Sequence, residues 1–182
     1  MPKVFVSIGS CVNRKDNVRA ALKALRKRFG LLCYSSVYET EALGFKGDPF
    51  FNLVVSFDSN VGTEKLKQFF RSIERKQGRC RGVEMPGPCP LDIDLLLYGE
   101  TLLDTPELKL PRDDVLTHAY VLEPLAELVP EKCYPGTAAC YQELWADYRR
   151  QHPSTSLRLI WDPFEQTAHS QNWCYPDYTL AC

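Results

Sequence analysis

Asp92 and Asp94 are the residues whose type and spacing most clearly suggest chemistry. They interrupt the apolar run of residues 91–98, which predicts a buried strand. Residues i and i+2 of a strand point to the same face, so the two carboxylates should lie side by side. Adjacent buried anions repel each other, and a divalent cation would stabilise them. Oxygen ligands favour Mg²⁺, which often shares substrate phosphates. The segment therefore predicts a magnesium site in an enzyme that acts on a nucleoside triphosphate.

The alternative for this segment is a strand whose polar face simply meets water. Asp is depleted in strands, and Ser or Thr would suit a solvated face better, so the metal site is the preferred interpretation. A bare D-x-D pattern also occurs in solvated strands. Other segments of the chain are therefore needed to distinguish a metal site from a solvated strand.

The composition limits the classes of function. The chain has 182 residues, which suits one domain, and its 45% hydrophobic and 25% charged residues are typical of a globular protein. A formal net charge of -1 argues against a general nucleic-acid binder. The sequence contains no apolar run as long as a membrane span, and residues 1–6 enter a strand-like run without the apolar region of a signal peptide. We therefore expect a cytoplasmic protein with no nucleic-acid or membrane partner.

The cysteines are expected to be free thiols. There are eight, and no export signal accompanies them. No C-x-x-C pair is present, so a zinc site is not expected. The eight are Cys11, Cys33, Cys80, Cys89, Cys133, Cys140, Cys174 and Cys182.

The hydrophobic pattern predicts the elements that position the two aspartates. Strands are expected at residues 4–8, 31–40, 50–57 and 91–98, with helices over 18–29 and from an N-cap at Thr63 to Gly78. The order β-α-β-β-α-β predicts an α+β, ferredoxin-like fold with an antiparallel sheet under two helices. Further helices are expected at 120–128 and 141–148. We expect one domain over residues 1–149 and a docked C-terminal extension over 150–182.

Several segments together resemble one family, from about Val4 to Pro130. They are Val6–Ser10, Ser35–Thr40, Phe50–Asn52, Ile73-Glu74, Gly78–Arg81, Leu91–Gly99 and Tyr120–Leu128. As a set, in this order, they resemble the 6-hydroxymethyl-7,8-dihydropterin pyrophosphokinase family of folate biosynthesis. The resemblance implies transfer of the β,γ-pyrophosphoryl group of ATP to the hydroxymethyl oxygen of a reduced pterin, with release of AMP. It also implies two Mg²⁺ ions held by Asp92 and Asp94. We expect a monomer whose partners are ATP and the pterin.

The resemblance also assigns roles to individual residues. Catalysis would involve Arg79, Asp92 and Asp94. The pterin would be bound by Thr40, Leu43, Phe50, Asn52 and Tyr120. The flat ring needs aromatic faces and an amide that both donates and accepts, which Asn52 can supply. The nucleotide would be bound by Glu74, Arg81, Leu95, Lys109, Arg112 and His118.

The chain departs from the family in its phosphate loop. Cys89 stands where the family has a phosphate-contacting Arg, Pro90 replaces a Thr, and Met85 replaces a common Arg. A guanidinium makes forked bonds to phosphate that a thiol cannot make. Arg112 also stands where many members have His. Three hypotheses follow: an active enzyme with a modified loop, a paralogue with a different acceptor, and a non-catalytic pterin- or nucleotide-binding protein.

Overall fold

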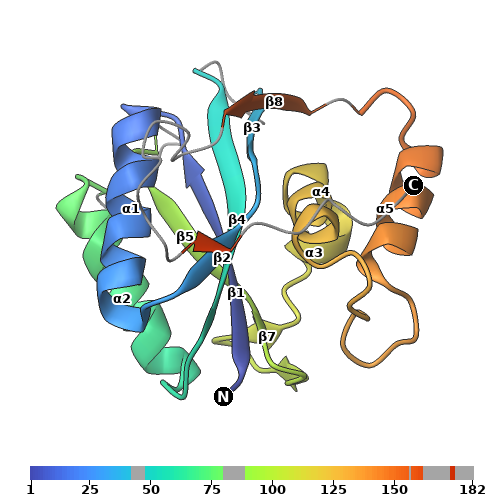
Figure 1. Cartoon of the computed structure of the whole chain (residues 1–182), viewed down its shortest axis with the longest axis horizontal. Helices are drawn as coiled ribbons and strands as arrows, with labels where there is room; N and C mark the ends of the chain where they lie inside the picture. Colours follow the sequence, from blue (N-terminus) through green and yellow to red (C-terminus); the bar gives the residue numbers. More distant parts are fainter. Residues whose placement is uncertain (42–47, 80–88, 156, 162–172, 175–182) are drawn as a thin grey trace.

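The computed structural model describes residues 1–41, 48–79, 89–155, 157–161 and 173–174. Figure 1 shows the whole chain. Its elements, in chain order, are β1 (Lys3–Ser10), α1 (Arg14–Phe29), β2 (Leu32–Tyr34), β3 (Val37–Thr40), β4 (Phe50–Asp58), α2 (Thr63–Lys76), β5 (Asp92–Tyr98), β6 (Leu103–Asp104), β7 (Lys109–Leu110), α3 (Asp114–Thr117), α4 (Ala119–Leu128), α5 (Tyr141–Gln151), β8 (Arg158–Trp161) and β9 (Trp173–Cys174).

The main sheet has the predicted ferredoxin-like arrangement. β5, β1, β4 and β2 lie side by side in that order, and each neighbouring pair is antiparallel. β3 also pairs with β4 in the antiparallel sense, so β2 and β3 share the place of one strand. The β-α-β-β-α-β order is therefore confirmed.

The strand predicted over residues 31–40 is broken at Ser35 and Ser36. Ser35 still pairs with Val54, because its N–H donates to the Val54 carbonyl at 2.9 Å and its Oγ accepts the Val54 N–H at 3.0 Å. The Ser36 N–H instead donates to the carboxylate of Glu127, at 2.9 Å to the nearer oxygen. Side-chain oxygens of Ser35 and Glu127 thus accept backbone N–H groups in place of the regular ladder at this point.

Helices cover both faces of the sheet, as Figure 1 shows. On one face, Val4, Val6 and Ile8 of β1 form a core with α1 and α2. On the other face, Phe5 packs in a second core with the apolar side of α4, including Val121. The expectation of a sheet under two helices was therefore incomplete, because the apolar face of the predicted 120–128 helix needs the opposite side of the sheet.

Other boundaries differ from the sequence-based expectations. Gly62, in an extended conformation, is the N-cap of α2, and Thr63 is the first helical residue rather than the cap. The short helix α3 and the β6–β7 hairpin were not predicted. β8 pairs with β3 and β9 pairs with β2, although the sequence beyond residue 150 has no clear period.

Within the described residues, no helix is both long enough and apolar enough to span a membrane.

Candidate active site

A pocket of about 230 Å³ lies where β1, β3, β4 and β5 meet the N-terminal end of α4. The strand register explains its floor. Gly9 of β1 lies opposite Asn52 on one neighbouring strand and opposite Asp92 on the other. A Cβ at Gly9 would stand only 3.3 Å from the Asn52 side-chain oxygen, so glycine keeps the floor open. The lining residues are Ser7, Gly9, Thr40, Glu41, Phe50, Asn52, Asp92, Asp94, Asp114, Tyr120 and Val121.

Asp92 and Asp94 line this pocket together, and Ile93 between them is buried in the core on the opposite face. The strand alternation is the one expected from the sequence. The pKa of Asp94 is raised to about 6, first by burial and then by the charge of Asp92, and the guanidinium of Arg112 only partly offsets these effects. The charged form of Asp94 is therefore disfavoured in this pocket relative to water.

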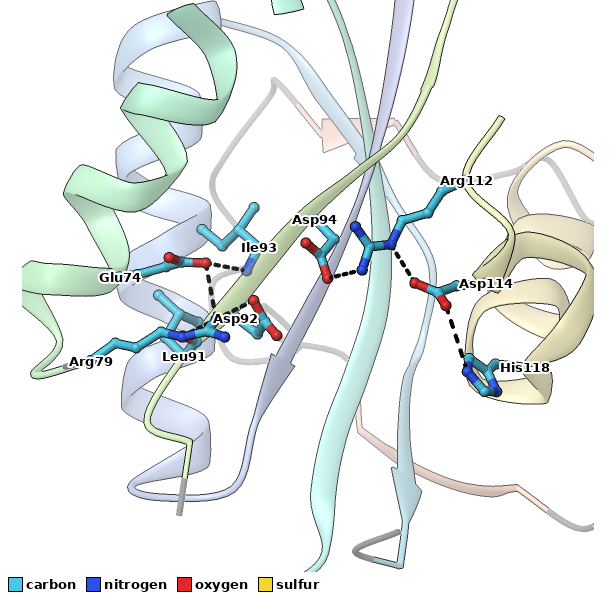
Figure 2. A network of polar contacts seen from close by, with 9 residues as sticks. All are labelled: Glu74, Arg79, Leu91, Asp92, Ile93, Asp94, Arg112, Asp114 and His118. Atoms are coloured by element: carbon cyan, nitrogen blue, oxygen red, sulfur yellow. Dashed lines mark hydrogen bonds and ion pairs between the residues drawn. The ribbon is translucent and has the colours of Figure 1, made fainter. Parts of the chain in front are cut away.

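Asp92 is held from the α2 side by Arg79 and Glu74. The guanidinium of Arg79 contacts the Asp92 carboxylate and also donates to Glu74 at 3.1 Å and to the Leu91 carbonyl at 3.2 Å. Glu74 is only 1% exposed and accepts the Ile93 N–H at 3.0 Å (Figure 2). These contacts fix the start of β5, where Asp92 lies.

Asp94 is held from the other side by a chain of polar side chains (Figure 2). Arg112 Nη2 lies 3.3 Å from Asp94, and Arg112 Nε contacts Asp114. Asp114 in turn lies 3.6 Å from His118 Nε2. The His118 ring stacks on the Tyr120 ring at a centroid distance of 4.9 Å. This chain of side chains thus reaches from the acid pair to Tyr120, the aromatic residue predicted to bind the pterin.

The residues present fit a magnesium ion. Asp92, Asp94 and Asp114 bring three carboxylates to one pocket, and the raised pKa of Asp94 means that added positive charge would be favourable there. Among the described residues no group of three or more His, Cys, Asp and Glu side chains is arranged to bind a metal by itself. Substrate phosphates and water would have to complete the coordination, as is usual for Mg²⁺.

The opposite wall of the pocket suits a flat polar ring. The Asn52 amide, 8% exposed, donates to the Thr40 hydroxyl at 2.8 Å and keeps its oxygen near the pocket floor. Phe50 and Tyr120 add aromatic surface to the same wall. The predicted pterin residues Thr40, Phe50, Asn52 and Tyr120 therefore come together, and Leu43 lies outside the described residues.

The predicted nucleotide residues are more scattered. Arg112 and His118 adjoin the pocket through Asp114, whereas the Leu95 side chain is buried in the core on the α1–α2 face. Lys109 is exposed and pairs with Asp113 at 2.8 Å. Arg81 lies outside the described residues. Contact of Glu74, Leu95 and Lys109 with a nucleotide stays a prediction, and the pocket lining includes none of them.

Five lining residues were missed. Ser7 and Gly9 share the strand alternation of β1 within a segment already recognised as a motif, so their positions could have been inferred. Asp114 follows a turn, and no hydrophobic periodicity in the surrounding sequence predicts that it lines the pocket. Glu41 and Val121 are neighbours of predicted residues, and only the pocket itself identifies them.

Cys89, at the departure from the family, is held through its backbone. Its carbonyl accepts the Cys11 N–H at 3.0 Å, and its own N–H points to the Cys11 sulfur at 2.9 Å. The next carbonyl, of Pro90, accepts from Ser10 at 2.5 Å and from Asn17 at 2.9 Å. Burial raises the pKa of Cys89 to about 11, so its side chain brings no charge to the site at neutral pH. Among the described residues, the free thiols include Cys11, Cys33, Cys89, Cys133 and Cys140.

Solved structures share the fold. A structure described as HPPK-DHPS in complex with substrates matches with a TM-score of 0.67 at 11% identity, over 83% of this chain and 46% of that chain. Wild-type HPPK-DHPS of Plasmodium falciparum with pteroate matches with a TM-score of 0.66 at 13% identity, over 84% of this chain and 44% of that chain. At such low identity these matches establish the α+β fold alone. The chain spans less than half of either structure.

Curated relatives carry the family assignment. A 2-amino-4-hydroxy-6-hydroxymethyldihydropteridine pyrophosphokinase of Pseudomonas aeruginosa is 37% identical over 137 residues, covering 73% of this chain and 84% of that protein. The enzyme of the same name from Haemophilus influenzae is 30% identical, covering 75% of this chain and 88% of that protein. A mitochondrial folate synthesis bifunctional protein of Arabidopsis thaliana is 33% identical, covering 78% of this chain but only 26% of that protein.

The family model described as 7,8-dihydro-6-hydroxymethylpterin-pyrophosphokinase (HPPK) matches residues 5–130. This match includes every residue that lines the pocket. The acid pair and the polar aromatic wall are thus parts of one matched region, and the chain belongs to the 7,8-dihydro-6-hydroxymethylpterin-pyrophosphokinase family.

Proposed function

We propose that this chain transfers the pyrophosphoryl group of ATP to the hydroxymethyl oxygen of 6-hydroxymethyl-7,8-dihydropterin and releases AMP, as a step of folate biosynthesis. The observation that carries the proposal is that Asp92 and Asp94 meet Asn52 and Tyr120 in one pocket of a chain of this family. The names of the bacterial relatives favour this reaction over a different acceptor or simple binding.

The pterin would lie against the wall formed by Asn52, Thr40 and Tyr120. The Asn52 amide carries both donors and an acceptor for the polar edge of the ring, and Tyr120 offers a stacking face. In this arrangement we expect the hydroxymethyl group to face the acid pair. In the transfer, the hydroxymethyl oxygen bonds to the β-phosphorus while the bond from that phosphorus to the oxygen shared with the α-phosphorus breaks.

The triphosphate would lie over Asp92 and Asp94. Mg²⁺, of which we propose two ions, would be held by these carboxylates and would offset the charge of the transferring group when bound. In the structure Arg79 contacts the carboxylate of Asp92, and Arg112 contacts that of Asp94. Both guanidinium groups are therefore close enough to the acid pair to turn to phosphate oxygens when a cation takes their place.

Incubation of the purified chain with ATP, Mg²⁺ and the pterin, followed by separation of the nucleotides, tests the proposal. AMP and the diphosphate ester of the pterin should form in equal amounts. Asp92→Ala is the matched control, and AMP no higher than with this variant would reject the proposed reaction. Chelation of the metal should also stop AMP formation, which tests the magnesium requirement separately.

We further propose that residues 1–149 form the catalytic unit, with residues 150–182 as an extension packed on it, and that the chain acts as a monomer. All residues lining the described pocket precede residue 150, which supports the first part of this proposal. Light scattering at working concentration should give the mass of one chain, about 20.8 kDa. A stable dimer would contradict this part of the proposal. The cytoplasmic location stays a prediction of the sequence.

A further inference from the structure

The carboxylate of Glu127, near the C-terminal end of α4, is bound to the break between β2 and β3. Its oxygens accept the Ser36 N–H at 2.9 Å, the Ser36 hydroxyl at 2.8 Å and the Tyr38 hydroxyl at 2.8 Å. All three donors are neutral, and hydrogen bonds from neutral donors to a carboxylate are stronger than those between neutral groups. This cluster, Ser36, Tyr38 and Glu127, ties α4 to the strand segment beside it.

The two elements joined in this way both supply residues to the pterin-facing wall of the pocket. α4 supplies Tyr120 and Val121, and β3 supplies Thr40. Tyr38 is also the register partner of Asn52, so the cluster holds the strand pair that positions the pterin-facing amide. The distance between the stacking ring and the polar edge of the pocket therefore depends on where Glu127 fixes the helix.

The helix can transmit this constraint along its length. Glu127 lies about two turns from Tyr120, a separation of about 10 Å along the axis. Val121, Leu122 and Leu125 are buried against the sheet between them, so the helix shifts as one body even though Pro124 lies within it. A slide or tilt at Glu127 would thus move the Tyr120 ring relative to Asn52.

We propose that Glu127 is a positioning residue for the pterin, which sets the separation between Tyr120 on α4 and the Thr40–Asn52 edge without touching the substrate. The inference rests on the proposed function, because it names the substrate side of the pocket that the Glu127 cluster holds. A role in stability alone would lower the amount of folded protein and would leave the ratio of the two substrate affinities unchanged.

The test compares Glu127→Ala with Glu127→Gln, and uses Glu123→Ala on the same helix as the matched control. Well below the unfolding temperature, Glu127→Ala should raise the KM for the pterin about tenfold, because a displaced Tyr120 ring loses its stacking contact with the pterin. The KM for ATP should rise less than about twofold. Glu127→Gln keeps an oxygen for Ser36 and should stay within about threefold of wild type. Glu123→Ala should change neither KM.

Equal changes in both KM values, or a change in kcat alone, would overturn the inference. If Glu127→Ala does not fold, the double variant Ser36→Ala with Tyr38→Phe removes both hydroxyl donors and leaves the carboxylate. It should raise the pterin KM about threefold, and an unchanged value would also overturn the inference.

Direct binding separates this inference from the proposed reaction. Pterin affinity measured by the intrinsic fluorescence of the pterin, with a non-hydrolysable ATP analogue, needs no turnover. A wild-type chain that binds the pterin but forms no AMP would reject the proposed reaction alone. The Glu127 inference would then depend on whether Glu127→Ala weakens that binding about tenfold.

Discussion

Replacing Asp94 with Asn should make the metal-free protein more stable and at the same time remove its affinity for magnesium. The pKa of Asp94 is raised from 3.8 to about 6, mainly by burial and then by the charge of Asp92. The folded chain therefore keeps the Asp94 proton over a pH range in which the unfolded chain has lost it. As the pH rises from about 4 through 6, the wild type loses free energy of unfolding relative to the neutral Asn variant.

The size of the effect can be worked from the shift. The difference between about 6 and 3.8 is about 2.2 pKa units, which at about 1.36 kcal/mol per unit gives roughly 3 kcal/mol above pH 7. The Asp94 side chain is 32% exposed, so solvent screening is substantial and we take roughly half, about 1.5 kcal/mol. At pH 4.5 the linkage relation gives about a third of the full effect, roughly 0.5 kcal/mol.

Urea unfolding of wild type and Asp94→Asn at pH 4.5 and pH 8, with a chelator present, measures this difference. Asp104→Asn, an exposed change of the same type on β6, should give a difference near zero at both pH values. At pH 8, Mg²⁺ with a non-hydrolysable ATP analogue should raise the Tm of the wild type and leave that of Asp94→Asn almost unchanged. A variant that is less stable than wild type at pH 8, or a difference that does not grow with pH, would refute the electrostatic reasoning.

Three other changes test further parts of the structure. Cys89→Arg should raise kcat about tenfold or more by adding a phosphate-binding guanidinium. Cys89→Ala should leave kcat unchanged, because the thiol is neutral. An unchanged kcat for the arginine variant would mean that another group already binds the phosphate. Gly9→Ala should raise the pterin KM about tenfold, because the added methyl pushes on the facing Asn amide. Gly62→Ala is the control and should leave this KM unchanged, since its added methyl meets nothing. Equal KM values for the two variants would contradict the role of Gly9 in the pocket floor. Cys133 and Cys140 face each other in an antiparallel bridge, as a pair that shares no direct backbone hydrogen bond. A disulfide oxidant should therefore join them and raise the free energy of unfolding by about 2 kcal/mol. Peptide mapping identifies the bond, and a bond between other cysteines would contradict this geometry.

The acid pair could be predicted from the sequence because its signal is local. Strand alternation alone places Asp92 and Asp94 on one face, and the structure has them there. The same holds for the order of the core elements, since each helix and strand has its own apolar period. Local pattern is enough when the neighbours that matter are one or two residues away.

The rest depends on contacts between distant parts of the chain. The predicted strand over residues 31–40 is broken because Glu127, 91 residues beyond Ser36, accepts its N–H. The family resemblance predicts Glu74 at the nucleotide, and no local pattern shows that its carboxylate also accepts from Ile93 and Arg79. Asp114 reaches the site through a turn that carries no period. In each case the partner, and not the residue itself, decides the structure.

The pairing of β8 with β3 affects whether copies of this chain associate with one another. β3 lies beside β4 on one side, and β8 occupies its other side through the register pairs Tyr38–Leu159 and Glu39–Arg158. Without β8, the N–H and C=O groups of β3 would form an open sheet edge, which invites strand addition by another chain. A chain cut before residue 158 would keep its pocket residues but would present this edge to its neighbours. Self-association and aggregation are the expected result, so these few residues protect solubility as well as the fold.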